Sequence, residues 1–333
     1  MHHLFNDNAA QIIAAGFIVG MIVGVTGMGG GALMTPALIF LGVGGTSSIV
    51  TADLTAAAVY KSGGALVHSR VGAPNFRLAG WLIAGSVPMA FLGPHLVSWF
   101  VDKNDVEDLL KECIGFALLL AASTYAIRLY IQLVRVRRGQ ARGEEEPRIR
   151  PVPTLLTGAL GGLLVGVTSV GSGSVIMVIL LILYPTLSPL KLVGTDLVQA
   201  VPLVLAAAIS NISVHGLEWD LTVPLIIGSV PGTLIGSRFA SKVPQSVIRR
   251  GIVIVLTMSG IALLDKAGWA PLGAGKDQTH PILIAVVGVA MLVLVPLVWG
   301  VLRKGQGLPM FGAPTVAELE GGQPVHARST SAP

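Results

Sequence analysis

Three charged residues stand in or near long apolar stretches of the sequence, where an ionised side chain needs a partner or a function. They are Asp53, Lys61 and Asp196. An ionised side chain at the centre of a bilayer costs at least about 2.5–3.5 kcal/mol, which makes these residues candidates for a transport site. Lys61 can serve as the countercharge of an anionic substrate, and Asp53 or Asp196 can bind a coupling proton or sodium ion. The alternatives are a structural ion pair for Lys61 and helix N-capping for both aspartates.

Two glycine-rich breaks, at 27–31 and 169–173, interrupt other apolar stretches and can present backbone N–H groups to an anion. The short helices that follow the breaks begin near Ala32 and Ser174, and the positive N-terminal end of a helix attracts anions. Glycine lets an anion approach the backbone closely, and serine and threonine add hydroxyl donors. The alternative is a kink combined with close packing of small residues. Together with Lys61, the candidate substrate-binding residues are Thr26, Gly27, Gly29, Gly30, Gly31, Thr168, Ser169, Gly171, Ser172 and Gly173.

The composition predicts an all-α, polytopic membrane protein. Charged residues are 12% of the chain and hydrophobic residues 53%, whereas a soluble domain is about a quarter charged. A helix needs about 20 apolar residues to cross a bilayer. Stretches of roughly this length occur at 47–67, 78–100, 109–134, 190–212, 221–240, 247–264 and 281–302.

Other classes of function have little support in the sequence. The net charge of +5 does not indicate nucleic-acid binding, because the cations lie in short loops between apolar stretches rather than in one patch. No P-loop lysine follows the glycines at 27–31, so we expect no nucleotide cofactor. The seven histidines are scattered and Cys113 is the only cysteine, so we expect no metal site, no cofactor and no internal disulfide.

The distribution of charge predicts the orientation of the chain in the membrane. Arginine and lysine gather at 70–77, in the central linker, at 238–250 and after 302, whereas the loops at 102–108 and 218–220 are acidic. Positively charged loops stay in the cytoplasm. We therefore expect a multi-pass protein of the cell (inner) membrane, with its N-terminus outside and with the linker and the C-terminus in the cytoplasm.

The two halves of the chain resemble each other in sequence. Val-Gly-Val-Thr at 23–26 recurs 142 residues later, and Gly-Ser-Val-Pro at 85–88 recurs 143 residues later. At the second offset Asp196 is equivalent to Asp53, and Asn211 to His68. Equivalent loops are basic in one half and acidic in the other, which predicts an inverted repeat like that of many secondary transporters. His68 and Asn211 are expected to act as gating residues or to lie at the membrane interface.

Each half is expected to contain one broken, glycine-rich helical hairpin and three spans. The predicted parts are an N-terminal repeat at 8–135, a cytoplasmic linker at 136–152, a C-terminal repeat at 153–265, an additional span at 280–303 and a disordered cytoplasmic tail at 304–333. The orientation requires each broken segment to make no net crossing, as a re-entrant hairpin or as two thin spans. We expect the breaks to meet near the middle of the membrane, where non-helical backbone must be buried in protein or face a water-filled cavity.

These motifs resemble those of the TauE/SafE sulfite exporter family over residues 10–265. The resemblance rests on Gly-Val-Thr-Gly-Met-Gly-Gly-Gly at 24–31 with its second copy, on Thr-Ala-Asp-Leu at 51–54, on Gly-Thr-Asp-Leu at 194–197 and on Glu218-Trp219. Ala52 departs from the second copy, which has Thr195, and Asn211 stands where such proteins often have histidine. The resemblance implies movement of sulfite, organosulfonates or other small organosulfur or carboxylate anions.

We therefore expect a secondary transporter that moves a small anion by alternating access around the paired breaks, and not an enzyme. One alternative is a cation or ion-coupled permease that uses Asp53 and Asp196. Another is a membrane-embedded enzyme or an assembly factor without transport activity. The sequence contains no motif for ATP binding, so the energy is expected from a gradient or a separate subunit. The oligomeric state is not predicted.

Overall fold

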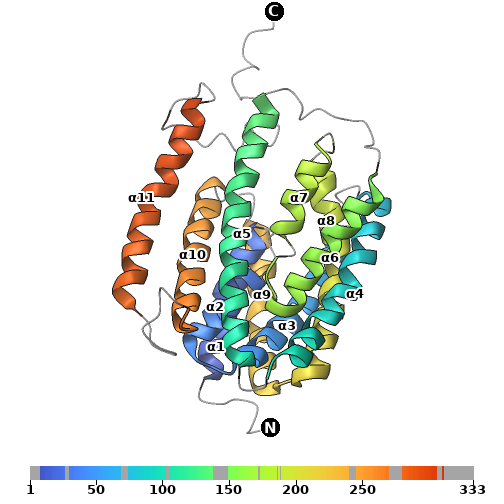
Figure 1. The fold of residues 1–333 in the computed structure, drawn as a ribbon, viewed down its shortest axis with the longest axis vertical. Helices are drawn as coiled ribbons and strands as arrows, with labels where there is room; N and C mark the ends of the chain where they lie inside the picture. The colour runs from blue at the N-terminus through green and yellow to red at the C-terminus, as the bar shows by residue number, and fades with distance from the viewer. Residues whose placement is uncertain are drawn as a thin grey trace, which may run out of the picture.

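The computed structural model describes the helical part of the chain. The described residues are 8–26, 30–68, 74–102, 105–137, 149–171, 173–185, 187, 189–239, 245–269, 280–305 and 310. They form eleven α-helices and no strand (Figure 1), which confirms the all-α prediction. The helices are α1 (Ala9–Thr26), α2 (Gly31–Leu41), α3 (Thr46–His68), α4 (Phe76–Phe100), α5 (Val106–Arg137), α6 (Pro151–Thr168), α7 (Val175–Leu183), α8 (Pro189–His215), α9 (Trp219–Phe239), α10 (Gln245–Lys266) and α11 (Pro281–Gly305).

Every apolar stretch predicted to span the membrane is a helix, and both predicted breaks separate two helices. The predicted linker and tail lie largely outside the described residues. Seven described helices are long and apolar enough to cross a membrane, namely α1, α4, α5, α6, α8, α9 and α11. The first helices of the two broken segments, α1 and α6, each have 18 residues. Proline in the first turn starts α6 before the apolar stretch itself begins.

Two helix pairs pack backbone against backbone through rows of glycine. On α6, a Cβ atom added to Gly158, Gly162 or Gly166 would collide with the backbone of α4 at Leu82, Ser86 and Ala90 respectively. On α1, the same is true of Gly20 and Gly24, which face Ser229 and Thr233 of α9. Small residues allow such close approach of helices where lipid removes the usual hydrophobic driving force. In both pairs the residue numbers rise together, so α1 runs parallel to α9 and α6 runs parallel to α4.

Each broken segment returns to the end of the bundle at which it began. The backbone N–H of Arg150, at the start of α6, donates to the hydroxyl of Tyr184 directly after α7 (3.0 Å). For the first segment, Gly44 lies after α2 and against Glu218 and Leu221 at the start of α9, the helix that runs parallel to α1. Both broken segments are therefore helical hairpins, α1–α2 and α6–α7, which begin and end at the same end of the bundle.

The two hairpins begin at opposite ends of the bundle. The hydroxyls of Ser47 and Ser48 at the start of α3 donate to Glu107 of α5 and to Glu218 before α9, each at 2.6 Å. The end of α4, the start of α5 and the start of α9 therefore share one end, and α1 begins there. Because α4 reaches this end with its last residue, α4 and its parallel partner α6 begin at the other end.

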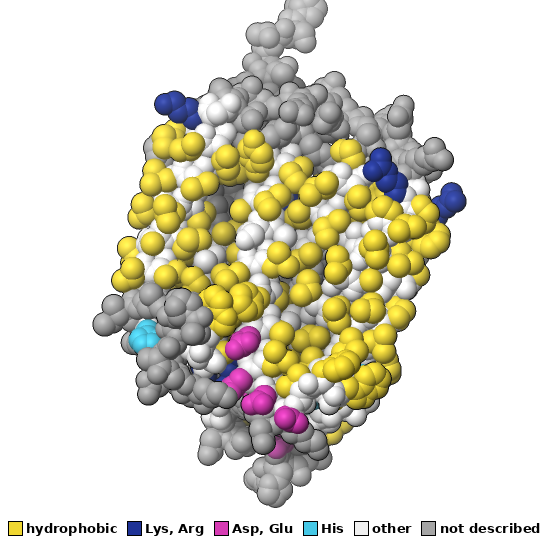
Figure 2. Space-filling view, viewed as in Figure 1, with side chains coloured by type: hydrophobic (Ala, Val, Ile, Leu, Met, Phe, Trp, Pro, Cys, Tyr) yellow, Lys and Arg dark blue, Asp and Glu magenta, His cyan; other side chains and the backbone are white. Residues whose placement is uncertain are grey.

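Charge separates along the same axis. Figure 2 shows Asp and Glu side chains gathered at the lower end of one face and Lys and Arg side chains near the upper end, with apolar side chains covering the middle. The packing is also reciprocal, because α1 contacts α9, α6 contacts α4, α3 contacts α8 and α5 contacts α10. Such packing is what an inverted repeat requires, and the repeat itself stays a prediction. The additional helix α11 stands at one side of the bundle (Figure 1), and only 11% of its most apolar stretch is buried.

Candidate functional site

The breaks of the two hairpins contact each other inside the bundle. Gly31 is the first residue of α2, and a Cβ atom added to it would collide with the carbonyl oxygen of Ser169 and would lie 2.5 Å from its Oγ. Gly30 lies equally close to the hydroxyl of Tyr60 on α3. The expectation that the two breaks meet is confirmed by this contact. Gly27 and Gly29 lie outside the described residues.

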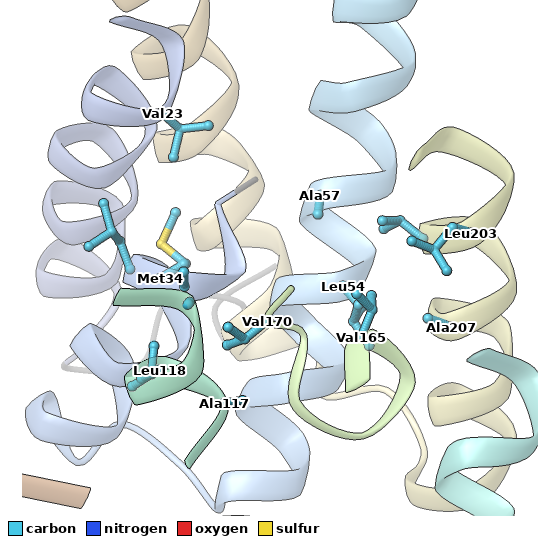
Figure 3. Close-up of a cluster of buried hydrophobic side chains, with 14 of the residues drawn as sticks. Val23, Met34, Leu54, Ala57, Ala117, Leu118, Val165, Val170, Leu203 and Ala207 are labelled. Carbon is cyan, nitrogen blue, oxygen red and sulfur yellow. The ribbon is translucent and has the colours of Figure 1, made fainter. Parts of the chain in front are cut away.

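Apolar side chains enclose the contact. Met34 of α2, Leu54 of α3 and Val165 and Val170 beside the second break are each at most 1% exposed, and Figure 3 shows them in one cluster with Ala117 and Leu118 of α5. Water is therefore excluded from these sides of the breaks, and polar groups there need partners within the protein.

Asp53 joins the two hairpins through one carboxylate oxygen. Its Oδ2 accepts hydrogen bonds from Thr35 Oγ1 on α2 (2.6 Å) and from Ser169 Oγ in the second break (2.9 Å). The residue is fully buried, and its other oxygen, Oδ1, has no hydrogen-bond partner among the described residues. Asp53 lies in the middle of α3 and is not an N-cap, so the alternative that it caps a helix is wrong.

The second break owes its shape to two residues with positive φ. Ser169 ends α6 in the left-handed region, with φ 60°, which most L-residues avoid and serine tolerates at a cost of about 1–2 kcal/mol. Gly171 has φ 123°, a conformation open essentially only to glycine. The turn aims the hydroxyl of Ser169 at Asp53. Ser172 lies outside the described residues, and Gly173 is partly buried beside the turn.

The threonines at the ends of the two first arms use their hydroxyls locally. Thr26 Oγ1 donates to the carbonyl of Ile22 (2.7 Å), and Thr168 Oγ1 donates to the carbonyl of Leu164 (2.6 Å). Thr168 Oγ1 also accepts from the backbone N–H of Val170 (3.1 Å). Both threonines therefore terminate their helices, and Ser169 is the break residue whose hydroxyl reaches the opposite hairpin.

Lys61 and Asp196 belong to a second charged group next to the first. Lys61 lies two turns beyond Asp53 on α3 and attracts the carboxylates of both Asp53 and Asp196. Asp196 on α8 is 9% exposed, its Oδ1 has no hydrogen-bond partner among the described residues, and Arg128 of α5 attracts it as well. The predicted acidic pair and Lys61 are thus brought together by α3 and α8, which pack against each other.

Of the predicted gating residues, the structure describes the surroundings of Asn211. The amide of Asn211 is buried on α8 and donates to the carbonyls of Gly166 on α6 (2.8 Å) and Ala207 (2.9 Å). Asn211 therefore holds α8 against the second hairpin. His68 is the last residue of α3, and its side chain lies outside the described residues.

Sequence reasoning missed several polar residues of the site. Thr35 was taken as part of an apolar arm, although a hydroxyl within an 11-residue helix next to a break was a usable signal. Arg128 was not named as a site residue, and it lies inside α5, which extends to Arg137. Gln199 on α8 is fully buried and donates to Ser86 of α4 (3.2 Å). The Tyr60 hydroxyl is buried and lies against the backbone of Gly30.

Comparison with known proteins identifies the family of the chain. The sequence pattern of the family described as "Sulfite exporter TauE/SafE" matches residues 12–263. The chain belongs to the TauE/SafE family. It is 34% identical over 258 residues to "Probable membrane transporter protein YjnA" of Bacillus subtilis (strain 168), covering 77% of this chain and 100% of that protein. It is 26% identical over 254 residues to "Probable membrane transporter protein YdhB" of the same organism, covering 76% and 99%. No solved structure matches the chain.

Membership in this family confirms the resemblance found in the motifs. The matched region, 12–263, covers both hairpins and ends before α11. The family and the names of the relatives indicate a multi-pass membrane transporter rather than an enzyme. Its surroundings are then a lipid bilayer and its cargo is a small solute.

Proposed function

We propose that this TauE/SafE protein is a secondary carrier that moves a small anion by alternating access around the contact between the two hairpins. The anion is sulfite, an organosulfonate, or another organosulfur or carboxylate anion, in keeping with the description of the family. The observation that carries the proposal is the contact of Gly31 with Ser169, because it joins hairpins that begin at opposite ends of the bundle.

Three kinds of donor near this contact suit an anion. The first turn of α2 has N–H groups without partners in its own helix, as every helix start does, and the helix dipole makes this end positive. The Tyr60 hydroxyl is buried and lies against the backbone of Gly30, directly before α2. Lys61 on the same helix supplies a full positive charge.

The packing of the hairpins supports a rocking movement. The arm α1 is fixed to α9 and the arm α6 is fixed to α4, so each hairpin is attached to a helix from the other half of the chain. In the proposed inverted repeat, with the N-terminus outside and the C-terminus in the cytoplasm, moving one half against the other separates the breaks first toward one side and then toward the other. Asp53 loses and regains its hydrogen bonds to Thr35 and Ser169 in each cycle.

The test is transport by the purified protein in liposomes. Uptake and exchange are measured for sulfite, thiosulfate, methanesulfonate and small carboxylates, with empty liposomes as the background. We expect flux of at least one anion above this background and its loss in Lys61→Glu, because the reversed charge repels an anion. If no anion of the panel moves, the protein is not the proposed carrier, and if Lys61→Glu transports normally, Lys61 has no part in binding.

A second candidate is a cation carrier, which the aspartates favour. Asp53 and Asp196 each keep a buried carboxylate oxygen without a hydrogen-bond partner among the described residues, and unwound hairpins can coordinate sodium with such oxygens and backbone carbonyls. Sodium flux in the absence of any anion would support this candidate, and Lys61→Glu would then leave the flux unchanged or raise it.

A further inference from the structure

The charged side chains between α3, α5 and α8 compensate one another. Asp53 and Asp196 each carry a carboxyl, and Lys61 attracts both of them. Arg128 of α5 attracts Asp196. With both aspartates ionised, the two negative and two positive charges add up to zero. A bound anion would leave the group with one uncompensated negative charge, and such a charge is strongly unfavourable where water is excluded.

The two carboxyls differ in how firmly they are held as anions. Asp53 Oδ2 accepts two hydroxyl hydrogen bonds, and hydrogen bonds donated to a carboxylate favour its ionised form. The Oδ1 atom of Asp196 is buried and has no such partner among the described residues, and the residue keeps 9% of its surface exposed. Asp196 is therefore the carboxyl that a proton reaches more easily, whereas two hydroxyl groups stabilise the ionised form of Asp53.

We infer that Asp196 takes up a proton when the anion binds, so that one proton and one anion cross the membrane in the same direction. The inference rests on the proposed anion transport. The proton comes from water on the side where the anion enters and binds the Asp196 carboxylate. Neutral Asp196 releases Lys61 to pair with the anion. When the site opens to the other side, the anion leaves, the proton returns to water, and Lys61 pairs with Asp196 again.

The cations that attract Asp196 come from two neighbouring helices. Among the described residues, the charges acting on Asp196 are Lys61 from α3 and Arg128 from α5. The helices α4, α6 and α7 also pack against α8. In the described contacts, the backbone N–H of Asn75 directly before α4 donates to Thr195, and Gln199 donates to Ser86 of α4. The side-chain amide of Asn211 donates to the carbonyl of Gly166 on α6. These groups are neutral at every pH of interest.

The experiment follows protons and anions together in liposomes that contain a pH-sensitive dye. The probe is methanesulfonate, which remains a singly charged anion throughout, and another singly charged organosulfonate serves if methanesulfonate is not carried. We expect the lumen of wild-type liposomes to acidify by about one proton per anion taken up, as charge compensation requires. Anion flux without acidification, or with alkalinisation, would overturn the inference and leave the proposed function intact. Absence of any anion flux would instead contradict the proposed function.

Two substitutions assign the proton to Asp196. Asp196→Asn imitates the protonated carboxyl, so anion-for-anion exchange should persist and acidification during net uptake should fall to the background of empty liposomes. Asp196→Glu restores a titratable carboxyl and should restore acidification. Asp265→Asn is the matched control, because Asp265, near the end of α10, is another fully buried aspartate. Its carboxyl binds His280. This variant should acidify as the wild type does. Wild-type acidification in Asp196→Asn would place the proton elsewhere.

Discussion

Two aspartates at equivalent positions of the two halves lie in different surroundings. Asp53 is fully buried and accepts hydrogen bonds from one residue of each hairpin. Asp196 keeps some exposure and interacts with two cations, Lys61 and Arg128. One carboxyl thus accepts hydrogen bonds from hydroxyl groups of both hairpins, whereas the other lies near two cations from α3 and α5.

The residues that donate to Asp53 explain this difference. At the offset of 142 residues that relates the two breaks, Thr35 corresponds to Met177 and Ser169 to Gly27. Neither methionine nor glycine has a side chain that donates a hydrogen bond. The carboxyl is therefore present in both halves and its hydroxyl partners are present in one set only. The two copies of a residue in an internal repeat can therefore have different functions.

The largest effect is expected where the two breaks touch. Gly31→Leu places a side chain where the carbonyl oxygen of Ser169 lies. Overpacking of this kind costs about 1–3 kcal/mol, so we expect the transport rate in liposomes to fall roughly tenfold to hundredfold.

Gly80→Leu is the matched control, because a Cβ atom added to Gly80 on α4 meets no atom within 4 Å. This variant should transport as the wild type does. If Gly31→Leu also transports normally, the contact between the hairpins is only packing.

A smaller effect is expected from the hydrogen bonds of Asp53. Thr35→Val keeps the shape of the side chain and removes one of the two donors. A hydrogen bond between membrane helices contributes about 0.6–1.7 kcal/mol, so the free energy of unfolding should fall by about that amount, measured by denaturation in detergent micelles.

A double-mutant cycle with Asp53→Asn separates this bond from other effects of the two substitutions. We expect the double variant to lose less stability than the sum of the single variants, since both remove the same interaction. Strict additivity would mean that Thr35 and Asp53 do not stabilise each other. The effects of Asp196→Asn and Thr35→Val on stability should be additive, because Thr35 donates its hydrogen bond to Asp53 and not to Asp196.

Much of the fold could be predicted because it follows from local sequence. Apolar stretches of sufficient length define the helices, and proline and glycine define where α6 starts and where both hairpins break. The charges in the loops set the expected directions of the spans. The start of α6 lies inside the predicted linker at 136–152, since the first turn of this helix is made of proline-rich sequence rather than an apolar run.

The partners of the site residues could be predicted only in part. Asp53, Lys61 and Asp196 are conspicuous in the sequence because charges are rare in apolar stretches. The hydrogen bonds of Asp53 depend on Thr35 and Ser169, which are 18 and 116 residues away in the chain. Such pairings arise from the packing of α2, α3 and the second break, and no periodicity within one segment encodes them.

The smallest effect is expected from making the second break resemble the first. Ser169→Gly introduces the residue found at the related position 27 and removes one donor to Asp53. It also relieves the left-handed backbone of Ser169, where an L-residue costs about 1–2 kcal/mol relative to glycine. The gain offsets the lost hydrogen bond, so the free energy of unfolding should stay near that of the wild type while transport slows, because the hairpins lose a link that forms in each cycle. Thermal unfolding and counterflow on the same preparation measure both quantities. A large loss of stability would show that the Ser169 hydroxyl supports the fold itself, and unchanged transport would leave Thr35 as the sole hydroxyl through which Asp53 acts on a hairpin.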